Sequence, residues 1–185
     1  PARENTSQRE RICFWMAGRI GIPFSPQRFV HIYVNGNRRG NIYGDTLHVS
    51  SDYVESWFPE AVGGEIFKID DWFEFPVDGQ FTNFACYDST LQEFTTTSNV
   101  LKKGRYRWNW EKKSNKVLTD DYGRVLELVQ AMSETNAAAF LAKANALLDV
   151  DAWAGMIALR HAVCDWDGYG YARGKNAYAY KPAEG

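Results

Sequence analysis

The sequence predicts an α+β fold, because strand patterns and helical patterns occupy largely different parts of the chain. Strand-like segments dominate up to Trp110, and three successive helical periodicities follow before one last strand. A doubly wound sheet would instead alternate the two kinds of element. With 185 residues, 45% hydrophobic and 24% charged, the chain can bury one substantial core.

The first element is predicted to be a helix over residues 7–20. Ser7 is a suitable N-cap, because its hydroxyl can accept a hydrogen bond from a free amide of the first turn. Gly21-Ile22-Pro23 ends the helix, since proline cannot continue the ladder of hydrogen bonds. The apolar side chains recur at helical spacing, at Ile12, Trp15, Met16 and Ile20.

A hairpin is predicted to follow this helix. Residues 28–34 alternate in a way that suits a strand, and Asn35-Gly36 tolerates the positive φ of a turn. We expect the return strand near residues 41–43, which makes the loop through Gly40 longer than two residues.

The middle of the chain combines a short helix, a strand and an irregular stretch. Residues 51–61 form the predicted helix, which Gly63-Gly64 ends. The predicted strand begins at residues 65–69 and continues to Phe75-Pro76. Residues 77–104 are polar and rich in Thr, Ser, Asn and Gly, so we expect a long loop or an insertion there.

The last third of the chain is predicted to be mainly helical. Before it, residues 105–110 alternate cleanly, which predicts a strand with Tyr106, Trp108 and Trp110 on one face. Helical periodicity then covers residues 120–133, 136–148 and 151–164. A final strand is expected near residues 176–180.

Charge and composition exclude several classes of protein. The net charge is −2 and the isoelectric point is about 6.0, so the basic surface of a nucleic-acid-binding protein is missing. No apolar run reaches the ~18 residues of a membrane span. The chain starts with a polar segment and without Met, so we expect no signal peptide and interpret it as a segment of a longer protein. Localisation therefore cannot be inferred from its ends.

The cysteines do not form a disulfide framework, because there are only three, at Cys13, Cys86 and Cys164. Cys13 and Cys164 fall in helical patterns, so we expect buried free thiols, with one disulfide left open. No Cys/His spacing suggests zinc.

Acidic and amide residues gather at the turn between the last helix and the last strand. Asp165, Asp167 and Asn176 are interspersed with glycines in this segment. Phosphoryl transfer needs a carboxylate that receives the proton of the attacking hydroxyl and an oxygen ligand that holds Mg²⁺. Capping and turn formation around Gly168 and Gly170 would explain the same residues, and on the residues alone this is the simpler interpretation.

The motifs of the chain resemble, in order, those of the CotH family of atypical kinases, which is typified by a spore-coat protein. Arg19-Ile20-Gly21-Ile22-Pro23 is similar to the Leu/Ile-Gly-x-Pro helix end of that family. Asn35-Gly36 with Gly40 is similar to its Asn-Gly-x-x-x-Gly turn. Residues 64–68 resemble its Gly-x-Leu/Ile-Tyr-Lys strand, and residues 110–113 its Tyr-Glu-x-Lys strand.

The C-terminal motifs extend the resemblance over most of the chain. Asp149-Val150-Asp151, Asp167-Gly168-Tyr169 and residues 176–180 resemble the family's Asp-Val-Asp helix start, Asp-Gly-Tyr/Phe loop and Asn-Tyr-x-x-Tyr strand. The resemblance implies a divergent protein-kinase-like fold, present here in part. It also implies that ATP and Mg²⁺ or Mn²⁺ are used to phosphorylate Ser or Thr hydroxyls of a protein substrate.

The resemblance also assigns roles to single residues. Asp167 matches the catalytic aspartate, and Asn176 matches the asparagine that helps to bind the metal. Asp165 is a weaker rival for the acidic role and a further candidate metal ligand. Lys68 and Lys112 lie on strands near the expected cleft and could bind phosphate, although solvated surface positions would explain them equally well.

Four departures from the family pattern stand out. A glutamate of the family aligns with Leu47, where Asp45 is the nearest acid, and Arg173-Gly174-Lys175 lengthens the spacing between Asp167 and Asn176. The family's upstream Arg-Gly segment and downstream Trp-Asp-x-Asp metal motif lie outside residues 1–185. We therefore expect a kinase domain segment that is incomplete as an enzyme by itself.

Two other functions stay open. A non-catalytic pseudokinase or structural module of a bacterial envelope or coat would explain the departures, and would suit an extracellular or spore-coat location. A carbohydrate-binding module is suggested only by the tryptophans, for which core packing is the simpler use. These are Trp57, Trp72, Trp108, Trp110 and Trp166.

Overall fold

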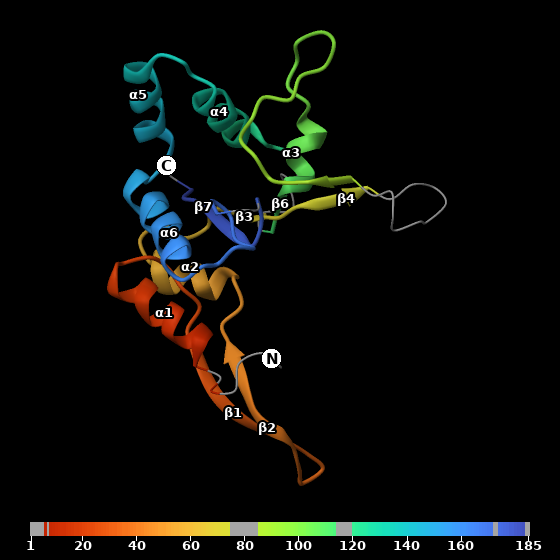
Figure 1. Ribbon diagram of the computed structural model, residues 1–185, viewed down its shortest axis with the longest axis vertical. Coiled ribbons are helices and arrows are strands. Elements are labelled where there is room, and N and C mark those ends of the chain that lie inside the picture. The colour runs from red at the N-terminus through yellow and green to blue at the C-terminus, as the bar shows by residue number, and fades with distance from the viewer. Residues whose placement is uncertain (1–5, 7, 75–84, 114–119, 172–173, 184–185) are drawn as a thin grey trace. The chain divides into compact units, whose positions relative to one another are not determined.

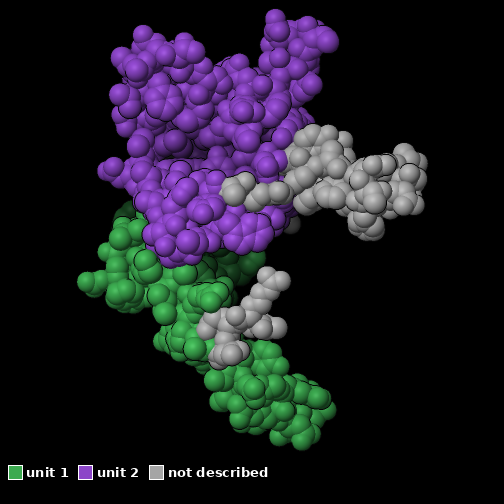
Figure 2. Space-filling view, viewed as in Figure 1, with its two compact units in different colours: residues 1–62 green, residues 63–185 purple. Residues whose placement is uncertain are grey.

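The computed structural model describes residues 6, 8–74, 85–113, 120–171 and 174–183. Its helices and short antiparallel sheets confirm the α+β class (Figure 1). The chain divides into two compact units, residues 1–62 and residues 63–185 (Figure 2). No helix of the described part is long and apolar enough to cross a bilayer.

The first unit consists of two helices and a hairpin. Its elements are α1 (Arg9–Arg19), β1 (Gln27–Val34), β2 (Asn37–Thr46) and α2 (Ser51–Trp57). Phe24 joins the helices, because its ring lies 5.2 Å from that of Trp57 and 6.2 Å from that of Phe14. The indole nitrogen of Trp57 also donates a hydrogen bond of 3.0 Å to the carbonyl of Phe24. The predicted cap, Ser7, lies outside the described residues.

The hairpin turn differs from the expectation. Val34 pairs with Asn37, so the turn contains only Asn35 and Gly36, whose φ angles are +50° and +77°. Two left-handed residues match the twist of the flanking strands, which allows the tightest connection. The prediction of a longer loop was therefore wrong. Gly40, with φ of +57°, lies instead at an irregularity within β2.

The second unit is built on a three-stranded antiparallel sheet in the order β6-β3-β7. These strands are Trp110–Lys112, Glu65–Ile69 and Ala177–Lys181 respectively. A separate two-stranded sheet pairs β4 (Trp72–Glu74) with β5 (Ala85–Tyr87). The helices are α3 (Lys103–Asn109), α4 (Gly123–Met132), α5 (Ala137–Leu147) and α6 (Val150–Ala162).

The segment predicted as a strand over residues 105–110 is mostly helix α3, and this prediction was wrong. Tyr106 and Asn109, three positions apart, are the buried residues of the helix, whereas Trp108 is 65% exposed. The alternation of aromatic residues therefore did not mark a buried face. Only Trp110 continues into a strand, as the first residue of β6.

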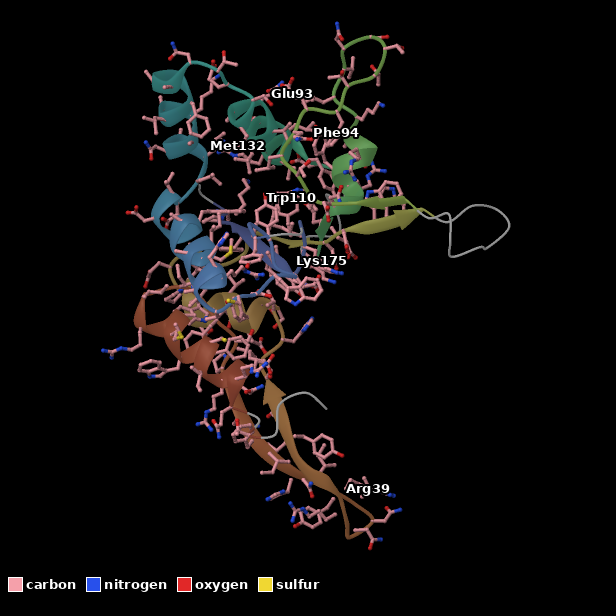
Figure 3. All side chains as sticks on the ribbon, in the orientation of Figure 1. Arg39, Glu93, Phe94, Trp110, Met132 and Lys175 are labelled. Atoms are coloured by element: carbon pink, nitrogen blue, oxygen red, sulfur yellow. The ribbon has the colours of Figure 1, made fainter. Side chains whose placement is uncertain are left out.

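The core of the second unit draws on β3, α3, β6, α4 and β7. Ile69 of β3 and Val129 of α4 are completely buried, and Trp110 is 2% exposed (labelled in Figure 3). The ring of Trp153 in α6 lies 6.5 Å from that of Trp110. The helices predicted over residues 120–133, 136–148 and 151–164 are all confirmed, as is the final strand.

Two further expectations concern the irregular stretch and the thiols. Within residues 77–104, the described part begins with β5 and ends at the start of α3. The residues between these two elements form no helix, and one isolated bridge pairs Thr95 with Leu101. Cys13 is half-buried, but Cys164 is exposed just after α6, so the expected burial of that thiol was wrong.

Candidate active site

A tight turn follows α6 and carries the acidic residues singled out in the sequence. The amide of Asp165 donates to the carbonyl of Arg160 at 2.9 Å, and the amide of Gly168 donates to the carbonyl of Asp165 at 3.0 Å. Tyr169 anchors the turn, since its ring packs 5.8 Å from Trp153 and 6.4 Å from Trp110. Burial raises the pKa of Tyr169 to about 12.

The structure brings Asp167 and Asn176 together. The side-chain amide of Asn176 donates to the backbone carbonyl of Asp167 at 2.8 Å and to its Oδ2 at 3.1 Å. Asn176 itself adopts a left-handed φ of +57°, just before β7 begins. This conformation is uncommon for a residue with a side chain but is tolerated by asparagine. The sequence-predicted carboxylate and amide therefore form one polar pair at the start of a strand.

Asp165 belongs to a neighbouring contact centred on Arg160. The guanidinium of Arg160 binds Oδ2 of Asp165 at 2.8 Å and donates to the backbone carbonyl of Asn176 at 2.5 Å. Burial lowers the pKa of Arg160, while the charge of Asp165 opposes that shift. A Cβ atom at Gly168 would overlap both the guanidinium and the Asp165 carboxylate, so a larger residue there would make this ion pair shift.

Two residues of this site were missed by the sequence analysis, Asp71 and Lys175. The ammonium of Lys175 (labelled in Figure 3) lies 3.1 Å from Oδ1 of Asp167 and 3.5 Å from Oδ2 of Asp71. The hydrogen bond to Asp167 is the main cause that raises the pKa of Lys175. The acidic pair Asp70-Asp71, within the strand predicted from residues 65–69 to Phe75-Pro76, was the available signal. Only the pairing of β3 with β7 shows that Asp71 faces Lys175.

The two lysines proposed to meet phosphate have different surroundings. Lys68 pairs with Asp70 at 2.5 Å and keeps a third of its side chain exposed, and this hydrogen bond raises its pKa. The side chain of Lys112 is 2% exposed, and its ammonium lies 2.5 Å from Oε1 of Glu65. Its ammonium also lies 5.6 Å from the ring centre of Phe67, which favours a cation. A solvated surface position therefore does not describe Lys112.

Among the described residues, no group of three or more His, Cys, Asp or Glu side chains is placed to hold a metal ion. Two side-chain oxygens are candidate metal ligands. One is Oδ1 of Asn176, because the Nδ2 atom of that side chain is the one that bonds Asp167. The other is Oδ1 of Asp165, because Oδ2 of that carboxylate binds Arg160. Mg²⁺ is commonly bound through one or two protein oxygens, with phosphate and water supplying the others. The chemistry of these donors suits such a hard cation.

Asp45, the possible substitute for the family glutamate, lies in the first unit. Its carboxylate binds Nε of Arg28 at 2.7 Å across the hairpin, and both side chains are largely exposed. This contact belongs to the register of β1 and β2, in which Arg28 faces Asp45 directly.

Comparison with known proteins gives one clear finding. The family model described as CotH kinase protein matches residues 2–185, which is nearly the whole chain. No curated protein and no solved structure matches the chain. The order of motifs observed in the sequence and this match therefore agree.

Proposed function

The chain belongs to the CotH kinase protein family, and from this premise we propose that it transfers the γ-phosphate of ATP to a Ser or Thr hydroxyl of a protein. One observation supports this proposal most directly. Asp167 and Asn176, far apart in the loop, meet through the two hydrogen bonds of the Asn176 amide. A carboxylate beside an amide is the pairing that phosphoryl transfer uses to orient the acceptor and bind the metal.

In the proposed reaction, Asp167 orients the acceptor hydroxyl and receives its proton. The acceptor oxygen forms a bond to the γ-phosphorus of ATP, and the bond between that phosphorus and the β–γ bridging oxygen breaks. ADP leaves with the electron pair of the broken bond, and the proton of the hydroxyl passes to the Asp167 carboxylate. The chain contributes mainly position and charge, because such transition states need little covalent chemistry from the protein.

We assign the metal to the oxygens of Asn176 and Asp165. A divalent cation such as Mg²⁺ or Mn²⁺ would neutralise the charge of the phosphates when it is bound. The side-chain oxygen of Asn176 is the stronger candidate ligand, since the side-chain nitrogen of Asn176 is already turned toward Asp167. Asp165 has one oxygen committed to Arg160, so its share in metal binding is the weaker part of the proposal.

Of the two lysines, Lys68 is the better candidate for contact with nucleotide phosphate. A third of its side chain is exposed, and its partner Asp70 is also partly accessible. Lys112 would have to leave Glu65 and an enclosed position to reach a ligand. We therefore propose that Lys112 has a structural role and that any phosphate contact falls to Lys68.

The proposal is tested by comparing Asp167→Ala and Asp167→Asn with the wild-type full-length protein. Transfer of labelled γ-phosphate to a library of Ser- and Thr-containing peptides is measured with Mg²⁺. We expect both variants to lose about 10²-fold or more in rate, since general-base catalysis contributes about 10² to 10⁴. Glu127→Gln changes an exposed acid of α4 that belongs to none of these motifs, so it serves as the control and should retain activity. Retained transfer by Asp167→Ala would rule out the assigned role.

A non-catalytic module of a bacterial envelope or coat is the second candidate function. The observation in its favour is that Oδ1 and Oδ2 of Asp167 are engaged by Lys175 and Asn176, which suits a structural turn. A thermal unfolding series with ATP and Mg²⁺ separates the two. Binding should raise the midpoint if the protein is a kinase, and an unchanged midpoint at millimolar ATP would favour the structural module.

A further inference from the structure

The pairing of β3 with β7 determines which residues face each other beyond the ends of the strands. Ile69 of β3 is opposite Ala177 of β7 in an antiparallel ladder. Continuing that register by two residues brings Asp71 across from Lys175. The 3.5 Å contact between their side chains agrees with this placement. The register of β3 with β7 therefore determines where Asp71 lies relative to the turn that carries Asp165 and Asp167.

Asp71 is held in place by the hydrogen bonds of the residue that precedes it. The residue before it, Asp70, exchanges two hydrogen bonds with Asn109 at the end of α3, at 3.0 and 2.9 Å. Asn109 is 3% exposed and accepts a bond from Arg105. The side chain of Asp71 is only 5% exposed. The backbone contacts of Asp70 therefore fix the position from which Asp71 meets Lys175.

Lys175 is held by the backbone next to it. The carbonyl of Gly174 accepts a hydrogen bond of 3.0 Å from the amide of Ser89, which is buried. A Cβ atom at Gly174 would come within 2.5 Å of that amide nitrogen and 2.7 Å of the Ser89 carbonyl oxygen. This close approach is possible only for glycine, and it fixes where the side chain of Lys175 begins.

We propose that Lys175 is a positioning residue, which Asp71 anchors and which in turn holds the carboxylate of Asp167. Lys175 contacts Oδ1 of Asp167, and the Asn176 amide contacts Oδ2, so the carboxylate is held at both oxygens. The adjacent residues Lys175 and Asn176 thus fix the orientation of one catalytic group. This inference rests on the proposed function, because it concerns how Asp167 is aimed at the acceptor hydroxyl.

The test measures phosphate transfer in the full-length protein for Lys175→Met, Lys175→Arg and Asp71→Asn. For Lys175→Met we expect kcat to fall about 10²-fold while KM for ATP stays within about 3-fold, because a misaimed group slows the reaction without weakening binding. Lys175→Arg keeps the charge and should recover to within about 10-fold of the wild type. Asp71→Asn, which loosens only the anchor, should lower kcat about 10-fold.

The anchor is tested by combining the changes. The double variant of Asp71→Asn with Lys175→Met should be no slower than Lys175→Met alone, since Asp71 acts through Lys175. Multiplied effects would overturn the proposal, as would a Lys175→Met variant with normal kcat or with a raised KM alone. Lys143→Met is the matched control, because it removes an exposed ion pair with Glu134 and should not change kcat. If Lys175→Met does not fold, the kcat of Asp71→Asn tests the proposal instead. This substitution replaces a single heavy atom and keeps the size of the side chain.

The Asp167→Ala variant in the same assay distinguishes the two possible failures. If that variant is inactive while Lys175→Met is fully active, only the positioning role is overturned. If Asp167→Ala keeps its activity, or the wild type transfers no phosphate, the proposed function fails and this inference fails with it.

Discussion

The strands of the hairpin in the first unit and those of the sheet in the second unit have opposite surroundings. In the described structure, β1 and β2 pair only with each other, and all ten residues of β2 are exposed. Strand β3 lies between β6 and β7, with Ile66, Phe67 and Ile69 buried. Ile32 of the hairpin is 40% exposed, whereas Ile69 has no exposure at all.

This difference shows that a strand pattern predicts pairing better than it predicts burial. A two-stranded hairpin alone is marginal in water, whereas a third strand and a covered face supply independent stability. The buried sheet also positions the candidate active site, through Asp71, which lies two residues after β3, and Asn176, which directly precedes β7. The stability of the protein should therefore depend far more on this sheet than on the hairpin.

The largest expected effect compares one isoleucine from each region. Ile69→Ala should lower the free energy of unfolding by about 3 kcal/mol, because it leaves a cavity in a closed core. Ile32→Ala should cost less than about 1 kcal/mol, because that side chain already contacts water. Denaturant unfolding of both variants checks the comparison. Equal losses would show that the hairpin is covered in solution.

The buried ion pair of the sheet should give the next largest effect. Lys112→Met leaves the carboxylate of Glu65, 12% exposed, with Lys181 at 3.8 Å as its remaining cation. We expect a loss of about 2 kcal/mol, because the nearly buried carboxylate loses its closer cation and keeps the longer contact with Lys181. Lys113→Met, which removes an exposed pair with Glu111, is the control and should change little. A stable Lys112→Met variant would show that the pair contributes nothing net.

Alkaline pH should destabilise the second unit through Tyr169. Burial raises its pKa to about 12 in the folded chain, from about 10 when unfolded, so the unfolded state loses its proton first. The stability that Tyr169 contributes is complete below pH 10 and is lost as pH rises through 12, by at most about 3 kcal/mol. In the Tyr169→Phe variant, the free energy of unfolding should depend less on pH between 10 and 12. An unchanged slope would place the Tyr169 hydroxyl in water.

The smallest effect is expected at the surface ion pair of the hairpin. Arg28 and Asp45 are 80% and 47% exposed, so water screens their attraction. Arg28→Ala should change the free energy of unfolding by less than about 0.5 kcal/mol. A loss as large as that of Lys112→Met would contradict the contrast between the two regions.

Apolar periodicity predicted several elements of the second unit, including α6, none of whose residues is fully buried. Helices α4, α5 and α6 and strands β3 and β7 were found where the apolar spacing placed them. Helix α3 was missed because its aromatics alternate, although only Tyr106 and Asn109 are buried. Sequence cannot show which aromatic side chains are covered when the covering elements are distant along the chain.

The candidate site was predicted in part, for a similar reason. Asp167 and Asn176 share one loop, so their types and spacing drew attention to them. Asp71 and Lys175 were missed because they meet only through the β3–β7 register, across more than 100 residues of chain. The environment of Lys112 likewise depends on Glu65, its partner on the neighbouring strand.

The Arg160 guanidinium has a consequence for how the site tolerates change in length. By binding Asp165 and the carbonyl of Asn176, it ties together the two ends of the connecting segment. Once the ends are tied, added residues between them cost little, since the entropy of closing a loop grows only slowly with its length. A change of length between Asp165 and Asn176 should therefore keep the two ends together as long as both contacts of Arg160 persist.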